Sequence, residues 1–211
     1  EVPGSWLKKP PMPADSALHN ALDLRGNGEL PKENDKTLDM DAIKAIIAGA
    51  DKAMINQQNS VGQTALHMMA KFNAYRAEEC ILKKEIAQLL LEAGAAVDIK
   101  DDHGNTPMHI ACMTAEPLGG ITDKLCAAGA SITDPDQFFG MTPLHWAAQT
   151  GIPDVIKPLL DMPNIKEALE IQAKDGSKPL DIAIKGAEKK PYPFKSSSTI
   201  VKMIKEVQKK Q

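Results

Sequence analysis

Apolar residues recur along the chain at intervals of three and four, the spacing that places them on one face of a helix. The run over residues 86–95, IAQLLLEAGA, shows this most clearly, and similar runs occupy residues 43–50, 121–130 and 155–160. Three of the four runs end in Gly-Ala. Because Gly readily adopts the left-handed conformation that ends many helices, the pattern predicts a series of short helices with glycine stops.

A second pattern precedes these runs and repeats along the chain. Gly, a variable residue, Thr, Pro or Ala, Leu or Met, and His follow one another at residues 62–67, 104–109 and 140–145. Thr is a good helix N-cap and Pro fits the first helical position, so each copy predicts the start of a further helix. Weaker copies lie near residues 16–19 and 176–181. The positions aligned with the Thr are residues 16, 64, 106, 142 and 178, which are 48, 42, 36 and 36 residues apart.

This motif resembles the Thr-Pro-Leu-His-x-Ala signature of the ankyrin-repeat family. The resemblance implies an all-α fold, an ankyrin-repeat solenoid of stacked helix-turn-helix units with β-turn or hairpin tips. It also implies that His67, His109 and His145 are structural residues that hydrogen-bond between neighbouring turns. We expect a Pro-rich extended lead-in over residues 1–13, an ankyrin-repeat domain over residues 14–186, and a loop and C-terminal capping helix over residues 187–211. The expected repeats lie near residues 14–58, 59–100, 101–136, 137–172 and 173–211.

Some repeats depart from the family's period of about 33 residues. Repeat one has a polar segment with Gly and Pro over residues 25–36, which predicts a long loop between its helices. In repeat two, the strong helix formers over residues 73–84 predict lengthened helices instead. In repeat four, Pro163 replaces the usual Gly stop, and residues 165–173 predict a longer connection into repeat five.

The end of the chain is amphipathic and basic. Ile200, Ile204 and Val207 fall on one helical face and predict a closing helix over about residues 199–210. Residues 185–211 contain eight Lys and two Glu, whereas the whole chain has a net charge of −3. We expect this stretch to be a solvated helix face, and contact with nucleic acid or anionic lipid is the alternative. The acidic remainder favours basic or mixed-charge partners, and we expect no nucleic-acid partner for the chain as a whole.

Composition narrows the class of protein. Large rings are scarce, with 4 Phe, 2 Tyr and 2 Trp in 211 residues, so the core must consist of Ala, Leu, Ile and Met, as suits closely stacked helices. No apolar run reaches the roughly 18 residues of a membrane span, and no signal-peptide pattern opens the chain. Cys80, Cys112 and Cys126 lack the spacing of a zinc or redox motif, which favours a reducing, cytoplasmic setting.

Catalysis, metal binding and cofactor binding find little support in the chain. His109 and Cys112 lie three residues apart on one predicted helix and could form a base–nucleophile pair, but both occupy buried positions of the repeat motif. The motif histidines occur once per repeat and do not converge on one ion. No phosphate-binding glycine pattern is present. We therefore expect no enzyme activity, no metal and no cofactor.

One turn tip stands out as a binding site. Members of the ankyrin-repeat family contact partners through their turn tips and through exposed positions late in the first helix of each repeat. Phe138, Phe139 and Met141 place large apolar side chains at a tip where other repeats carry polar ones, which is typical of a binding hot spot. The expected partner-binding residues are Phe138, Phe139, Met141, Trp146, His103, Asn105, Phe72, Lys71, Met113 and Gln149.

Alternatives remain open at both the structural and the functional level. Phe138 or Phe139 could fold under its turn, Phe139 and Met141 could together be core residues, and Trp146 could pack between helices. The favoured function is a monomeric, non-enzymatic interaction domain, acting as an adaptor, scaffold or inhibitor, which binds another protein or peptide through its concave face and turn tips. The alternative function is the substrate-targeting part of a larger enzyme, which includes a bacterial effector delivered into a host cell.

Overall fold

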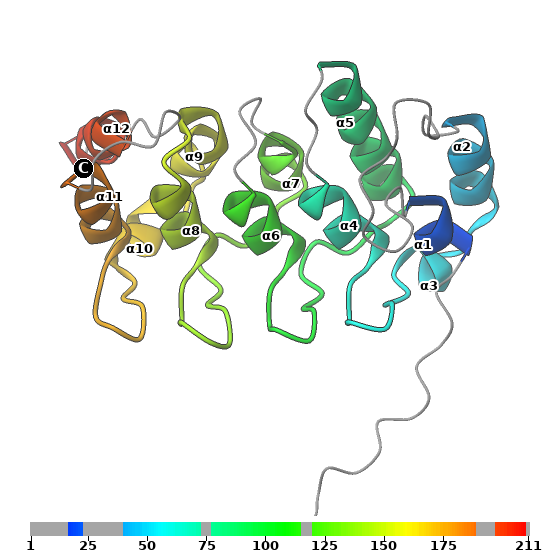
Figure 1. The fold of residues 1–211 in the computed structure, drawn as a ribbon, viewed down its shortest axis with the longest axis horizontal. Helices are drawn as coiled ribbons and strands as arrows, with labels where there is room; N and C mark the ends of the chain where they lie inside the picture. The colour runs from blue at the N-terminus through cyan, green and yellow to red at the C-terminus, as the bar shows by residue number, and fades with distance from the viewer. Residues whose placement is uncertain (1–16, 23–39, 73–76, 115–119, 189–196, 210–211) are drawn as a thin grey trace, which may run out of the picture.

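The computed structural model describes residues 17–22, 40–72, 77–114, 120–188 and 197–209. Within these ranges the chain forms pairs of helices that stack side by side into one elongated array (Figure 1). The helices fall into two rows, an inner row and an outer row, in which each helix contacts the next member of its own row. The predicted all-α solenoid of stacked helix pairs is confirmed.

The two rows alternate along the chain. The inner row consists of α1 (Ala17–Leu22), α4 (Ala65–Lys71), α6 (Pro107–Met113), α8 (Pro143–Thr150) and α11 (Pro179–Glu188). The outer row consists of α2 (Met40–Gly49), α5 (Ala77–Glu92), α7 (Thr122–Ala127), α9 (Pro153–Leu160) and α12 (Ser197–Lys209). The short helices α3 (Lys52–Ile55) and α10 (Ile165–Glu170) lie in the connections that follow α2 and α9.

The central inner helices all begin with the same local structure. Thr64, Thr106 and Thr142 are N-caps with extended backbones, and α6 and α8 have Pro in the first turn. The backbone N–H of each Thr donates to Nδ1 of the His three residues later, at 3.1–3.2 Å. In α11, where Asp181 replaces the His, its carboxylate accepts the N–H of Lys178 at 2.9 Å. The motif therefore specifies where each inner helix starts.

The other ring nitrogen of the motif histidines joins neighbouring repeats. Nε2 of His67 donates to the carbonyl of Asn105 at 3.0 Å, and Nε2 of His145 donates to the carbonyl of Ser177 at 3.1 Å. This confirms the predicted structural role for these two residues. His109 is buried in the same way and accepts the Thr N–H, but its Nε2 has no hydrogen-bond partner among the described residues.

Small and unbranched side chains form the core. Ala111, Ala147 and Ala183 lie two residues after the His position in α6, α8 and α11, and all three are buried where these helices contact one another. The small residue allows close packing of successive inner helices. None of the described Phe or Trp side chains is buried, so this core does not depend on aromatic residues.

Most of the predicted elements outside the motif are present. α5 has 16 residues and is the longest described helix, which confirms the lengthening in repeat two. α12 is the helix that was predicted over residues 199–210, and its Ile200 and Ile204 are buried against the stack. Gly94 and Gly129 adopt positive φ after α5 and α7, as predicted for glycine stops. Gly49 is instead the last residue of α2.

The connection after α9 contains a helix that was not predicted. Residues 165–173 were predicted to be a longer connection into repeat five, and within this connection Ile165–Glu170 form α10. Ile165, Ala168 and Leu169 are buried, and their spacing of three and four places them on one face, which is the reason that a helix forms there. The predictions for residues 1–13, 25–36 and 187–196 lie almost entirely outside the described residues.

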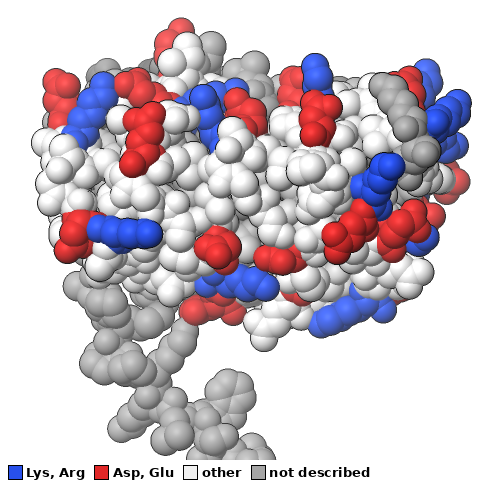
Figure 2. All heavy atoms as spheres, turned by 180° about the vertical axis from the view of Figure 1, so that it is seen from behind, with Lys and Arg blue, Asp and Glu red and all other residues white. Residues whose placement is uncertain are grey.

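The outer surface carries charges of both signs. Figure 2 shows the back of the molecule, where Asp and Glu lie among Lys side chains around a broad uncharged area. Within the described ranges, no helix combines the length and apolar character that crossing a membrane requires.

Candidate partner-binding surface

Four hairpin turns project from one side of the stack, each one just before an inner helix (Figure 1). In three of them, residues 59–63, 101–105 and 173–177, the first residue donates its N–H to the carbonyl of the last at 2.8–2.9 Å. The turn before α8 is one residue longer, because the N–H of Asp136 donates to the carbonyl of Met141 at 2.9 Å. The extra residue lies in the predicted aromatic tip.

Two aromatic side chains are displayed at the tip of this longer turn. Phe138 and Phe139 are each 58% exposed, so neither folds under the turn. The Phe138 ring lies 5.8 Å from the ring of His103 on the preceding hairpin. The Phe139 ring meets Trp146 of α8 edge-on, with 5.9 Å between the ring centroids. Trp146 itself is half-buried and packs against the core. It therefore both contributes to the surface at the tip and packs among the helices, which were the two alternatives for it.

A buried carboxylate holds this tip in place. Asp136 is only 5% exposed, and its Oδ1 accepts the N–H of Phe139 at 2.6 Å. Its Oδ2 accepts the indole N–H of Trp146 at 3.0 Å. On the other side, the N–H of Lys174 in the next hairpin donates to the carbonyl of Phe139 at 2.9 Å. The tip is therefore fixed before any partner arrives, which reduces the entropy lost on binding.

Met141 was expected to be displayed with the two rings, with a place in the core as the alternative, and the structure shows the alternative. Its side chain is only 8% exposed. Met141 is the last residue of its turn, the position held by Gln63 and Ser177 in other hairpins, and these two side chains are buried as well. At this position the chain enters the inner helix, so the side chain lies under the turn and contributes to packing.

The remaining predicted contact residues lie around the tip or at the ends of the inner helices. His103 is exposed on the neighbouring hairpin. Asn105 is half-buried, and its N–H donates to Asp101 at 2.9 Å. Partner contact by these side chains stays a prediction. At the C-terminal ends of the inner helices, Lys71 and Gln149 are exposed, whereas Phe72 and Met113 are half-buried.

The structure adds an apolar stripe that the sequence did not reveal. Met68, Ile110, Trp146 and Ile182 occupy the same position in α4, α6, α8 and α11, directly after the motif His or its Asp replacement. All four are half-buried and pack against the core. Because successive inner helices contact one another, these residues form a row that we call the inner-helix stripe. Aligning this column of the repeats would have found it.

Burial determines the chemistry of the His109–Cys112 pair. It lowers the pKa of His109 and raises the pKa of the Cys112 thiol well above its ordinary value. Burial also raises the pKa of Cys126, to about 12. A thiol that stays protonated is a poor nucleophile and metal ligand. In the part of the chain that the structure describes, no three His, Cys, Asp or Glu side chains are arranged to hold a metal ion.

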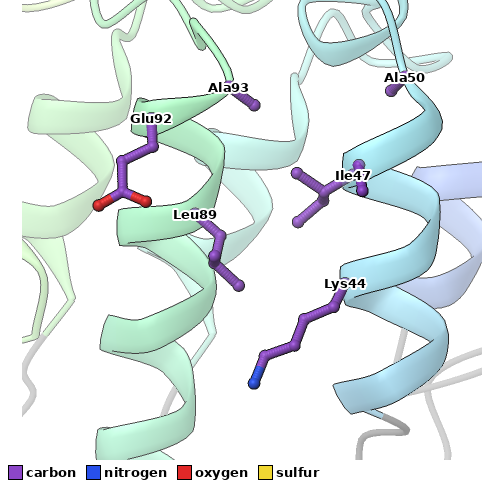
Figure 3. Close-up of a pocket in the computed structure, with 7 residues that line it drawn as sticks. Lys44, Ile47, Ala50, Leu89, Glu92 and Ala93 are labelled. Carbon is purple, nitrogen blue, oxygen red and sulfur yellow. The ribbon is translucent and has the colours of Figure 1, made fainter.

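A shallow groove of about 380 Å³ lies between the outer helices α2 and α5 (Figure 3). Ile47 and Leu89 line its opposite walls, and Lys44 reaches toward α5. There the ammonium of Lys44 forms an ion pair with Glu85 at 2.8 Å. The groove therefore offers mainly small apolar walls, and the hairpin tips are the more distinctive surface.

Comparison with known proteins identifies the family. A family model described as ankyrin repeats in three copies matches residues 35–136, and a single ankyrin-repeat model matches residues 139–167. The chain belongs to the ankyrin-repeat family. Its motif positions and its two rows of helices follow from this membership.

Three relatives illustrate the range of similar proteins. NF-kappa-B inhibitor alpha of Homo sapiens is 30% identical over 168 residues, which are 77% of this chain and 47% of that protein. The Gallus gallus protein of the same name is 33% identical over 110 residues, 52% of this chain and 28% of that protein. Alpha-latrotoxin-Lh1a of Latrodectus hasselti is 31% identical over 139 residues, 66% and 10% of the two chains. The chain thus spans less than half the length of each of these relatives.

Proposed function

We propose that this chain is a non-enzymatic interaction domain that binds a partner protein or peptide through its hairpin tips and inner-helix stripe. The observation that carries the proposal is the pair of exposed rings, Phe138 and Phe139, on a tip that Asp136 already holds in place. Large aromatic side chains held rigidly at a surface are typical of binding hot spots, because they release much apolar area from water at little entropic cost.

The relatives support an adaptor or inhibitor role. NF-kappa-B inhibitor alpha is, by its name, an inhibitor of another protein, and it matches most of this chain. The extended concave surface of a repeat array can bind a target without any catalytic group. The protonated thiols of Cys112 and Cys126 are consistent with that role. We propose that the domain acts as a monomer in the reducing interior of a cell.

Replacing both exposed rings tests the proposal. The double variant Phe138→Ser/Phe139→Ser is expressed as bait in cells of the source organism. It should capture at least tenfold less of each partner protein than the parent chain does. Losing two hot-spot rings costs this much in typical interfaces. Quantitative mass spectrometry of the captured proteins measures the loss.

A matched control uses an exposed apolar residue away from the tips. Ile81 on α5 is 65% exposed, and Ile81→Ser should leave the captured proteins unchanged. Thermal unfolding curves of both variants should match the parent, since the replaced side chains are exposed. If the double variant keeps its partners, or if Ile81→Ser loses the same ones, the hairpin tip is not the binding site.

A further inference from the structure

We propose that the partner segment bound at the Phe138/Phe139 tip carries an arginine or lysine side chain next to apolar residues, and that this cation packs on the exposed rings. The inference rests on the proposed function and adds the chemistry of the partner to it. Three observations support it: the exposure of the rings, the charges of the hairpins and the inner-helix stripe.

The rings themselves favour a cation. The face of an aromatic ring is the negative side of its quadrupole, and it attracts an ammonium or guanidinium group within about 6 Å of its centre. Among the described residues, Phe138 lies against one ring, that of His103, and Phe139 against one, that of Trp146. More than half of each Phe stays open to solvent. Arginine fits best, because its planar group also stacks on rings.

In the hairpins around the rings, backbone and side-chain N–H and O–H groups donate hydrogen bonds to the carboxylates of Asp101, Asp136 and Asp175. Asp101 accepts the N–H groups of His103 and Asn105, both at 2.9 Å. Asp136 accepts only N–H groups as well. In the next hairpin, hydrogen bonds from the Ser177 amide and hydroxyl hold the pKa of Asp175 below its usual value. These donors carry no charge of their own, and the nearby ammonium of Lys185 also contributes to the lowered pKa of Asp175.

Acidic residues outnumber basic ones in the three hairpins around the rings. Residues 100–105, 136–141 and 173–177 contain four Asp, of which Asp101 and Asp136 are buried, and two exposed Lys. Lys185 of α11 adds a third cation, whose Nζ donates to the Ser177 hydroxyl at 2.9 Å. The Nζ of one of these lysines, Lys174, already donates to the carbonyl of Gln137 at 2.6 Å. An arriving cation therefore gains attraction from the hairpins, whereas an anionic segment would be repelled.

The apolar part of the partner has a place beside the tip. Trp146 belongs both to the tip, through Phe139, and to the inner-helix stripe. Ile110 and Met68 continue the stripe along the preceding inner helices. A segment that crosses the inner row can therefore place apolar side chains on the stripe and a basic side chain on the rings.

A displayed library of random twelve-residue peptides tests the inference directly. Peptides are selected for binding to the parent chain and to Ile81→Ser, and those that also bind Phe138→Ser/Phe139→Ser are removed. The remaining pool should be at least twofold richer in Arg and Lys than the unselected library. Asp and Glu should be depleted. In synthetic copies, replacing the basic residue by neutral citrulline or norleucine should weaken binding by about tenfold.

A ring-specific variant separates the cation contact from simple apolar contact. Phe138→Leu/Phe139→Leu keeps apolar side chains at the tip but removes the rings. This variant should bind the arginine peptide and its citrulline copy with affinities that differ by no more than about twofold to threefold, because only the hairpin charges remain.

The outcomes separate this inference from the proposed function. A pool that depends on the two Phe residues but shows no excess of Arg and Lys overturns the inference and leaves the proposed function intact. Equal binding of the citrulline copy by the parent chain also overturns it, as does undiminished discrimination by the Leu variant. If no selected peptide depends on the rings, both proposals are wrong.

Discussion

Phe139 and Met141 lie two residues apart in one turn, and their environments are opposite. The Phe139 side chain is displayed beside Trp146, whereas the Met141 side chain is buried where the chain enters α8. Position in a repeat motif indicates which segment forms the tip, but the direction of each side chain depends on the turn. Met141 is the last residue of its turn, and its side chain is buried as those of Gln63 and Ser177 are at the same position in their shorter turns.

Met141 should therefore behave as a core residue. We expect Met141→Ala to lower the free energy of unfolding by about 2 kcal/mol or more, because it removes buried apolar atoms and leaves a cavity. Phe139→Ala should change the free energy of unfolding by no more than about 0.5 kcal/mol, as is usual for exposed positions. Urea unfolding followed by circular dichroism measures both values. Similar losses for the two variants would mean that the Phe139 ring is part of the core.

Sequence alone located this tip but not the residues that support it. Phe138 and Phe139 were identified because they are apolar residues at positions where neighbouring repeats have polar ones. Asp136 was missed, since an Asp at the start of a turn is common and its bond to Trp146 joins residues on different elements. A long-range hydrogen bond of this kind leaves no local pattern in a single sequence.

At the scale of elements, the motif histidine joins one hairpin to the next. Its Nδ1 accepts the Thr N–H, so the proton of the neutral ring is on Nε2, which reaches the carbonyl of the following repeat in His67 and His145. A second proton on the ring would remove the acceptor that holds the N-cap. Burial accordingly lowers the pKa of His67, His109 and His145.

These lowered pKa values predict a loss of stability in mild acid. In the unfolded chain a histidine takes up a proton near pH 6.5, whereas the folded ring resists protonation until a lower pH. The contribution of the neutral histidines to the free energy of unfolding is therefore fully present above about pH 7. It falls as the pH drops below 6.5, by up to about 1.4 kcal/mol per pH unit for each histidine. The urea midpoint should fall between pH 7.5 and pH 5.5, and His145→Gln should reduce that dependence. Equal midpoints at the two pH values would contradict this account.

The elements were predictable to different degrees, for physical reasons. The starts of α4, α6 and α8 follow from Thr and Pro, whose capping chemistry is local. α5 follows from a long run of helix formers. α10 was missed because it has only six residues, too few to display a clear helical period, and it forms when its apolar face meets the core.

At the scale of the whole molecule, a stacked array has two ends that need covering. Each repeat buries its apolar surface against its neighbours, so the last repeat needs an outer helix with one apolar and one polar face. α12 has this character and contacts both α9 and α11, as the last described member of the outer row. Its lysines 202, 205 and 209 are exposed, which fits the solvated face expected for the basic end of the chain.

The two faces of α12 should therefore respond differently to the same replacement. Ile200 and Ile204 are fully buried, so Ile200→Ser/Ile204→Ser should lower the free energy of unfolding by about 3 kcal/mol or more, from the loss of two buried side chains. Lys202→Ser/Lys205→Ser, on the exposed face of the same helix, should change it by no more than about 0.5 kcal/mol. Urea unfolding of the two pairs makes the comparison.

Because repeats transmit stability to their neighbours, the isoleucine pair should also speed amide hydrogen exchange in α11 and α8, with a smaller effect in α4. Unchanged exchange in α11 would show that α12 does not stabilise the end of the array.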